Sequence, residues 1–148
     1  MRSVIQRVTE ASVSIDGELY SKIDKGLLIL LGVCRGDNSE TAGSLAKKFI
    51  DLRIFSDDSG KMNLNVKDID GEILIISQFT LCSDKGKSGN RPGFSDAESP
   101  ETACVLYEEV VSRMKEYYSD KKIKTGVFAA DMKVSLINDG PVTILLDK

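Results

Sequence analysis

Apolar and polar positions change their spacing several times along the chain, and these changes predict strands near both ends. Partial alternation of β-branched and polar residues predicts strands at 4–8 and 11–15. Asp16-Gly17 is a hairpin signal, because a type I′ turn needs positive φ at both of its central residues. The return strand is therefore expected at 18–23.

Two apolar runs predict the central strands. Residues 27–33 are almost continuously apolar, which is typical of a strand buried on both faces. Residues 72–81 form the second run and follow a turn at Asp70-Gly71. Shorter strands are expected at 53–55, 123–128, 132–137 and 142–146.

Helical spacing occurs twice between these strands. The first helix follows Asp37-Asn38-Ser39, whose small side chains can cap free N–H groups. The second begins at Ser99-Pro100, with proline at the first helical position. The apolar faces are Ala42, Leu45, Ala46, Phe49 and Leu52 in the first helix, and Ala103, Leu106, Tyr107, Val110, Val111, Met114, Tyr117 and Tyr118 in the second.

The order of these elements favours one α+β domain over residues 1–148. Strands cluster at both ends with two main helices between them, so regular βαβ winding is not expected. We predict a mixed, largely antiparallel sheet with strong curvature. A length of 148 residues is ordinary for a single domain.

Composition excludes several kinds of chemistry. The chain has no histidine, which removes Ser-His-Asp and Cys-His triads and histidine zinc sites. Cys34, Cys82 and Cys104 lie far apart without C-x-x-C spacing, so we expect buried free thiols rather than disulfides or metal ligands. Neither a metal nor a cofactor is expected.

Charge and hydropathy indicate a cytoplasmic protein without a membrane segment. The longest apolar stretch, residues 27–31, is far shorter than the ~20 residues that span a bilayer. The N-terminus has no apolar leader. The net charge of −3 gives no global attraction for nucleic acid, so any RNA contact must use local basic patches.

Polar residues end the second central strand as Ser77-Gln78-Phe79-Thr80. They are either a solvated strand end or a ligand site, since a strand end holds backbone N–H groups rigidly for an oxyanion. Residues 138–143, Asn-Asp-Gly-Pro-Val-Thr, are either a plain turn or, with a cis Gly-Pro bond, a device that aims carbonyl groups.

Two further features have both a structural and a functional interpretation. Residues 82–99 show no periodicity, and loops of this length are often functional. Within them Lys85, Lys87 and Arg91 either form a solvated basic loop or contact phosphates. Arg7 is a charge in an apolar strand, and is either exposed or functional.

Taken together, six motifs of this sequence resemble those of the D-aminoacyl-tRNA deacylases, and the resemblance runs from residue 1 to about 146. They are Met1-Arg2…Val4-Ile5-Gln6-Arg7-Val8, Gly60-Lys61-Met62-Asn63, Ser77-Gln78-Phe79-Thr80-Leu81, Asn90-Arg91-Pro92, Phe128-Ala129-Ala130-Asp131-Met132 and Asn138-Asp139-Gly140-Pro141-Val142-Thr143.

The resemblance implies a barrel-like fold and a homodimer that hydrolyses the ester between a D-amino acid and the 3′ end of tRNA. It implies that Ser77, Gln78, Phe79 and Thr80 line the pocket for the terminal adenosine and the ester. The remaining roles are also carried over. Gly140-Pro141 of the partner subunit, in cis, enters the same pocket, Arg7 holds that segment, Met132 lies near the substrate, and Asn138 and Thr143 support the segment.

An ester hydrolase without histidine can rely on its backbone and on its substrate. N–H groups near Phe79 and Thr80 can stabilise the oxyanion. The family resemblance favours the ribose 2′-hydroxyl as the group that orients the water. The competing mechanism makes Thr80 a nucleophile, but no base is evident to activate it.

Selection by a wall formed at Gly140-Pro141 would reject L-aminoacyl esters by steric clash. Such a wall cannot reject glycine, so glycyl-tRNA(Ala) is an expected second substrate.

The alternative function is a non-catalytic, homodimeric nucleic-acid-binding protein, against which the net charge argues. Lys121, Lys122 and Lys124 are either a second RNA contact or a solvated helix end.

Overall fold

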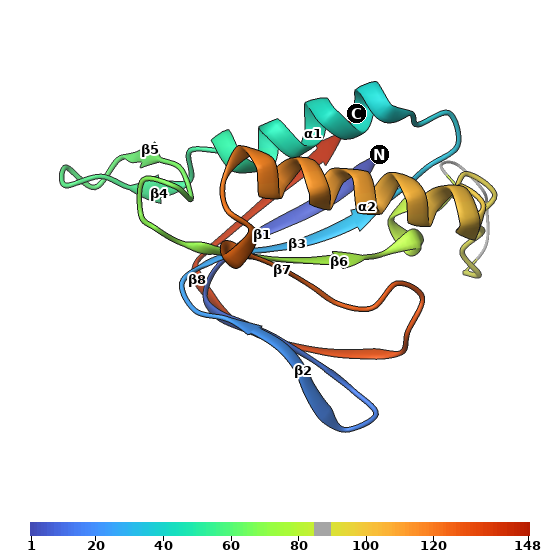
Figure 1. The fold of residues 1–148 in the computed structure, drawn as a ribbon, viewed down its shortest axis with the longest axis horizontal. Helices are drawn as coiled ribbons and strands as arrows, with labels where there is room; N and C mark the ends of the chain where they lie inside the picture. The colour runs from blue at the N-terminus through green and yellow to red at the C-terminus, as the bar shows by residue number, and fades with distance from the viewer. Residues whose placement is uncertain (85–89) are drawn as a thin grey trace.

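The computed structural model describes residues 1–84 and 90–148. It has strands and helices in the expected regions, but several of the expected strands are joined or shortened (Figure 1). The strands are β1 (Arg2–Ile15), β2 (Glu18–Ile23), β3 (Gly26–Gly32), β4 (Phe55–Ser56), β5 (Met62–Leu64), β6 (Glu72–Ser77), β7 (Ile123–Thr125) and β8 (Met132–Asp147). The helices are α1 (Ser39–Asp51) and α2 (Pro100–Tyr117), with 3-10 turns η1 (Phe79–Cys82) and η2 (Asp120–Lys122).

The long strand β1 organises the sheet. Its first half pairs antiparallel with β3, its second half pairs with β2, and β8 runs antiparallel along its other edge. Beyond β3 the sheet continues through β6 and β7, both in parallel pairing. The sheet is therefore mixed, as the sequence predicts.

Curvature brings the β1–β2 hairpin round toward β7. The Ser21 hydroxyl on β2 donates a hydrogen bond to the Thr125 carbonyl on β7, at 2.8 Å. The sheet is thus nearly closed into a barrel. The interior of the curl is filled by the apolar residues Val8, Ala11, Val13, Ile23, Leu28, Leu74 and Ile76.

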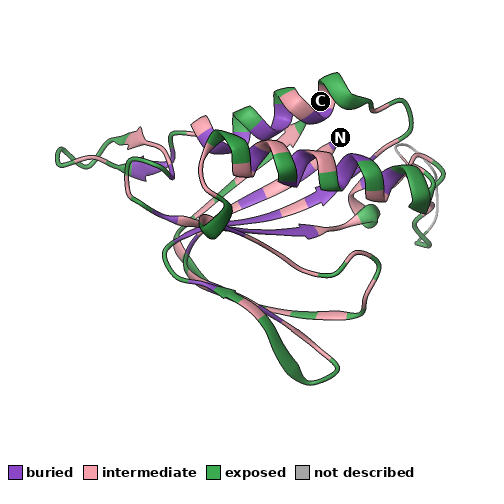
Figure 2. Ribbon diagram, viewed as in Figure 1, coloured by how far each residue is buried: buried purple, intermediate pink, exposed green. Residues whose placement is uncertain are grey.

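Both α-helices cover the same face of the sheet (Figure 1) and enclose the larger core. The predicted caps are confirmed, because Asn38 accepts a hydrogen bond from Thr41 N and Ser99 accepts one from Thr102 N. The predicted faces are buried from Ala42 to Phe49 and from Ala103 to Met114. Tyr117 is an exception: it is 41% exposed. Figure 2 shows the buried band between the helices and the strands.

Several strand boundaries were predicted wrongly. The strand expected at 72–81 ends at Ser77, and the one at 123–128 ends at Thr125. The pairs 4–8 with 11–15, and 132–137 with 142–146, are each one continuous strand. Residues 53–55 contribute only Phe55 to β4. For β6 the pairing partner sets the length, because its last pair joins Ser77 to Leu31 near the end of β3.

The prediction of free thiols was wrong for two of the three cysteines. Cys34 and Cys82 form a disulfide, while Cys104 is free. The two residues are 48 positions apart in sequence, but the parallel pairing of β3 and β6 brings the ends of these strands together. No helix in the described part of the chain is long and apolar enough to cross a membrane.

Candidate active site

The candidate site begins where β3 and β6 end side by side. Gln78 N donates to the Leu31 carbonyl at 2.7 Å, and the chain then leaves the sheet as η1. Gly32 permits this close approach, because a Cβ atom there would lie 2.8 Å from the Gln78 carbonyl oxygen. The predicted Ser77–Thr80 motif therefore lies at a strand end, and its second half is a helical turn.

A cavity of about 510 Å³ opens at this strand end. Its walls come from the end of β3, the end of β6 with the start of η1, the first half of α2 with the residues before it, and the loop before β8 with the start of that strand. The lining includes the side chains of Ser77, Gln78, Phe79, Tyr107, Phe128 and Met132. Three of the four predicted residues of the Ser-Gln-Phe-Thr motif, together with Met132, thus line one cavity.

Thr80 is the exception in this motif. It does not line the cavity, and its hydroxyl oxygen accepts a hydrogen bond from the Gln78 side-chain amide at 2.7 Å. Phe79 is 60% exposed and packs edge-on against Phe94, with ring centroids 5.3 Å apart. The Thr80 hydroxyl therefore contacts the Gln78 side chain, and Thr80 does not line the cavity.

The titratable side chains among the described lining residues are Tyr107, Glu98 and Asp131. Burial raises the pKa of the Tyr107 phenol, which donates to the Ile75 carbonyl at 2.8 Å and so remains protonated at neutral pH. Glu98 accepts from Ser99 N, and Asp131 is 86% exposed and paired with Lys133. All three side chains thus have a hydrogen-bond or ion-pair partner in the protein, so none is an unengaged general base.

No group of three or more His, Cys, Asp or Glu side chains in the described residues is arranged to hold a metal ion. The lining is otherwise mostly apolar, with the hydroxyl of Ser77 and the amide of Gln78 at one end. Such a cavity has the polarity typical of a small-molecule site.

The loop that precedes β8 closes the far wall of the cavity. Ala129 has a φ of 61°, which is uncommon for a residue other than glycine and is often found at functional sites. Beside this loop, Met132 packs over Gly126. A Cβ atom at Gly126 would lie 2.4 Å from the Met132 sulfur and 3.0 Å from Ile76 Cδ1. Gly126 thus leaves the space that Met132 occupies.

We expect Gly126→Ala to push Met132 into the cavity, because a methionine side chain can move more easily than the backbone of β7. The expected result is about a tenfold loss of activity, together with a loss of about 1–3 kcal/mol of stability from overpacking. Deacylation rates and thermal unfolding of the variant measure both effects. An unaltered rate would contradict the expectation that Met132 lies near the substrate.

Gly140-Pro141 lies in a protrusion of β8. The register pairs Gln6 with Thr143 and Val8 with Asn138, so four residues of β8 stand opposite Arg7 alone. The Gly140-Pro141 peptide bond is cis, and both residues are exposed. Asn138 and Thr143 are the paired residues on either side of this protrusion. None of these residues lines the cavity of its own chain.

The Arg7 side chain contacts the backbone at the start of the protrusion. Its side chain is only 12% exposed, and its Nε donates to the Asp139 carbonyl at 3.0 Å. Its Nη1 donates to the Ile54 carbonyl at 2.7 Å, and the guanidinium pairs with the Asp139 carboxylate at 3.3 Å. Arg7 is therefore not an exposed strand charge, and it fixes the backbone directly before Gly140.

The candidate RNA contacts are only partly described. Lys85 and Lys87 lie outside the described residues, and Arg91 is exposed. In the second candidate patch, contact with Asp70 raises the pKa of Lys122, which also donates to the Asp70 carbonyl at 2.7 Å. Lys122 is thus held by the protein, whereas Lys121 is exposed.

Sequence reasoning missed part of the lining. Tyr107 was predicted to be a core residue and also lines the cavity, and Phe128, Glu98 and Asp131 were not predicted as site residues. Phe128 and Asp131 belong to the Phe128–Met132 motif that the resemblance used, so this motif was the available signal. Nothing in the spacing indicates that α2 faces the end of β6.

Comparison with known proteins agrees with this geometry. The model of the D-Tyr-tRNA(Tyr) deacylase family matches residues 4–147. This chain is 55% identical to a D-aminoacyl-tRNA deacylase of Flavobacterium psychrophilum and 54% identical to one of Thermosipho africanus. Each comparison extends over 147 residues and covers 99% of this chain and 97% of the relative.

Two solved structures share the fold. One is described as the c-Myc DNA unwinding element binding protein, with a TM-score of 0.94 and 40% identity over 100% of this chain and 99% of the other. The second is described as a probable eukaryotic D-amino acid tRNA deacylase, with a TM-score of 0.84 and 14% identity over 99% and 98% of the two chains. At 14% identity, the second likeness concerns the fold alone.

The nearly closed mixed sheet, the cavity at the end of β6 and these matches define a hydrolase that acts on aminoacyl-tRNA esters. The chain belongs to the D-Tyr-tRNA(Tyr) deacylase family, whose curated relatives named here are D-aminoacyl-tRNA deacylases.

Proposed function

We propose that the cavity at the end of β6 is the deacylation site and that a homodimer completes it. The Gly140-Pro141 segment of one protomer would enter the cavity of its partner. The observation that carries this proposal is the placement of the segment, which is exposed, braced by Arg7, and outside the cavity of its own chain.

The surface of β8 supports an association through this strand. Ile137 is 55% exposed and Leu145 is 74% exposed, and they lie on either side of the protrusion. Burial of these two side chains against the partner would add apolar area to the proposed interface. A two-fold interface is reciprocal, so a contact that delivers one Gly140-Pro141 segment delivers both.

Chiral selection follows from the rigidity of the inserted segment. Carbonyl groups of the partner's protrusion would accept hydrogen bonds from the substrate amino group, and the same backbone would occupy the space of an L side chain. The discrimination is then a steric clash against the wrong isomer rather than an added contact with the right one. Arg7 contributes by preventing the segment from yielding.

Catalysis would need few protein groups, because an aminoacyl ester is already activated. The first N–H groups of a helical turn have no acceptor within that turn, and Phe79 and Thr80 begin η1. One such donor facing an oxyanion contributes roughly 2.7–4 kcal/mol of transition-state stabilisation. The adjacent ribose 2′-hydroxyl would orient the water, since the Thr80 hydroxyl is engaged with Gln78.

Steric rejection has a consequence for the achiral substrate. Glycine has no side chain to clash with the wall, so we expect glycyl-tRNA(Ala) to be cleaved, at a rate about 10- to 200-fold below that of D-aminoacyl-tRNA, the range for a lost apolar side-chain contact. Deacylation of radiolabelled glycyl-tRNA(Ala) measures this. Full resistance at enzyme concentrations about 200-fold above those that clear the D-aminoacyl ester would refute selection by a wall.

The partner is the aminoacylated 3′ end of tRNA, and a cytoplasmic location follows from this role. The alternative, a non-catalytic nucleic-acid-binding protein, is favoured by the name of one structural relative, which refers to a DNA element. Parallel deacylation assays with D-tyrosyl-tRNA and L-tyrosyl-tRNA separate the two functions. Enzymatic release of D-tyrosine with the L-ester intact supports the deacylase, and binding without release supports the alternative.

A further inference from the structure

The disulfide lies directly behind the candidate active site. Cys34 follows the cavity residue Val33, and Cys82 is the last residue of η1, three positions after Phe79. The bridge therefore joins the end of β3 to the end of the turn that carries Phe79 and Thr80. Cys34 also forms an isolated bridge with Ala97, whose neighbour Glu98 lines the cavity.

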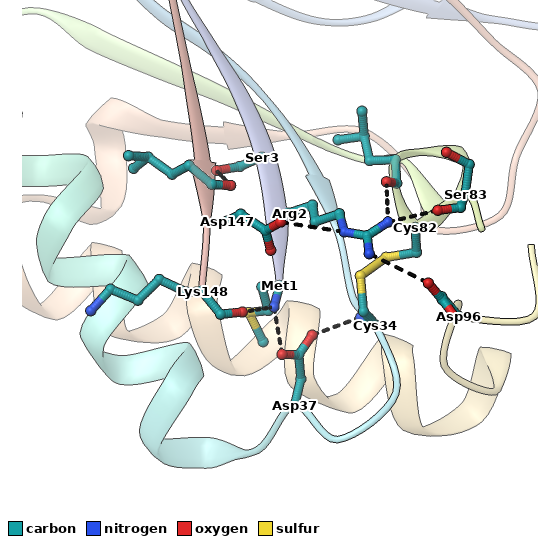
Figure 3. A network of polar contacts seen from close by, with 12 residues as sticks. Met1, Arg2, Ser3, Cys34, Asp37, Cys82, Ser83, Asp96, Asp147 and Lys148 are labelled. Carbon is teal, nitrogen blue, oxygen red and sulfur yellow. Dashed lines mark hydrogen bonds and ion pairs between the residues drawn. A yellow bond between two sulfur atoms is a disulfide. The ribbon is translucent and has the colours of Figure 1, made fainter. Parts of the chain in front are cut away.

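Arg2 contacts the backbone at the same end of η1, near Cys82 and Ser83 (Figure 3). Its Nη1 donates to the Ser83 carbonyl at 2.8 Å and to the Leu81 carbonyl at 3.2 Å. Its guanidinium also pairs with Asp96 at 3.4 Å and with Asp147 at 3.7 Å. The C-terminal end of η1 thus has two tethers, one covalent and one made of hydrogen bonds and ion pairs.

We propose that Cys34 and Cys82 form a reversible thiol–disulfide site that sets the catalytic rate by tightening or loosening η1. The reductant is a dithiol, and the oxidant that restores the bridge is a small disulfide such as glutathione disulfide. Disulfides are rare in reducing compartments except where they are transient or regulatory. The resemblance assigns no role to either cysteine.

The exchange reaction has an accessible entry point. Cys34 is half-buried whereas Cys82 is fully buried, so we expect the attacking thiolate to react at the Cys34 sulfur. A bond forms between the reductant sulfur and the Cys34 sulfur while the Cys34–Cys82 bond breaks. Cys82 leaves as a thiolate that takes up a proton. The second thiol of the reductant then displaces Cys34. Two electrons and two protons pass to the protein, and the reductant becomes a disulfide.

Reduction removes one of the two tethers on η1. The C-terminal end of η1 is then held by the Arg2 contacts, while the Gln78–Leu31 hydrogen bond and the Phe79–Phe94 contact still hold its start. Because small misplacements of positioning groups slow a reaction strongly, we expect the single-turnover rate to fall roughly three- to tenfold on reduction. Substrate affinity should change little, since the walls formed by α2 and the loop before β8 are untouched.

The proposal requires that both cysteines be shielded until a dithiol is added. The full-length protein would be alkylated before and after treatment with dithiothreitol, and the modified cysteines identified by mass spectrometry. We expect Cys104 to be the cysteine available for labelling before reduction, and Cys34 and Cys82 to become labelled after it. Labelling of both before reduction would overturn the proposal.

The rate of the same samples would be measured with D-tyrosyl-tRNA under single-turnover conditions. We expect the wild-type protein to slow on reduction and to recover with glutathione disulfide, and Cys104→Ser to respond in the same way. Cys34→Ser should have the reduced rate in both states. An equal wild-type rate in the two states would refute the switch, whereas no deacylation in either state would contradict the enzymatic assignment instead.

A double change tests whether the two tethers act on the same turn. In Arg2→Met, which has lost the second tether, reduction should slow deacylation by a larger factor than in the wild type. In Arg113→Met, which removes contacts to Glu109 and Ser39 on the outer helices, the factor should stay that of the wild type. Equal factors in Arg2→Met and the wild type would show that the bridge does not act through η1.

Discussion

Removal of the 2′-hydroxyl from the terminal ribose of the tRNA is expected to slow deacylation by about 10²-fold or more, the usual range for a lost acid–base group. The reason is the chemistry of the cavity wall. Tyr107 is held protonated by its burial, and Glu98 and Asp131 are already engaged with other groups. We therefore propose that a hydroxyl of the substrate orients the attacking water. Single-turnover rates on D-tyrosyl-tRNA ending in adenosine or in 2′-deoxyadenosine measure the effect.

Matched protein variants distinguish this mechanism from protein-assisted routes. Thr80→Ala should retain activity within about threefold, because losing one exposed neutral hydrogen bond to Gln78 costs little. Glu98→Gln and Asp131→Asn should also remain active. A folded Thr80→Ala protein without activity would contradict the ribose-assisted mechanism, and a normal rate on the deoxy substrate would remove the ribose from the mechanism.

Gly140→Ala is expected to abolish most D-aminoacyl-tRNA deacylation, by about 10²-fold, the loss seen when positioning is off by about 1 Å. Gly140 has a φ of 129°, which L side chains rarely adopt, and a Cβ atom there would lie 3.1 Å from the Arg7 guanidinium. The protrusion must therefore shift. The rates on D- and L-tyrosyl-tRNA should also approach each other, because a displaced wall no longer excludes the L side chain.

A glycine elsewhere provides the control for this change. Gly60 also has a positive φ, of 79°, but lies in the turn of the β4–β5 hairpin with no atom within 4 Å of an added Cβ. Gly60→Ala should cost some stability through its backbone and leave the ratio of D to L rates unchanged. Arg7→Met should act in the same direction as Gly140→Ala. Retention of the D to L ratio in both Gly140→Ala and Arg7→Met would contradict the wall.

The helices and the site motif could be predicted from the sequence for simple physical reasons. Helical spacing and the caps at Asn38 and Ser99 are local, and the polar residues after Ile76 interrupt an apolar run. The shape of the site could not be predicted in this way. Phe79-Thr80-Leu81 has good strand propensity, yet the neighbouring strand β3 ends at Gly32 and leaves those residues without a partner.

Long-range placement accounts for the other errors. Alternation of apolar residues on β8 gives no sign that its two halves form one strand with a protrusion, because that register is set by pairing with β1. The disulfide joins residues that only the parallel pairing of β3 with β6 makes adjacent. Cysteine spacing carries no information about such a pair.

Complementation between two defective proteins tests the shared site most directly. One protein would carry Phe79→Ala in the cavity, and the other Gly140→Ala in the protrusion. If each cavity is completed by the partner's segment, half of the randomly mixed dimers contain one intact site, so activity returns to about a quarter of the wild-type level in a two-fold assembly. If each protomer completes its own cavity, the mixture stays at the low activity of the two separate variants, and that result would contradict the account.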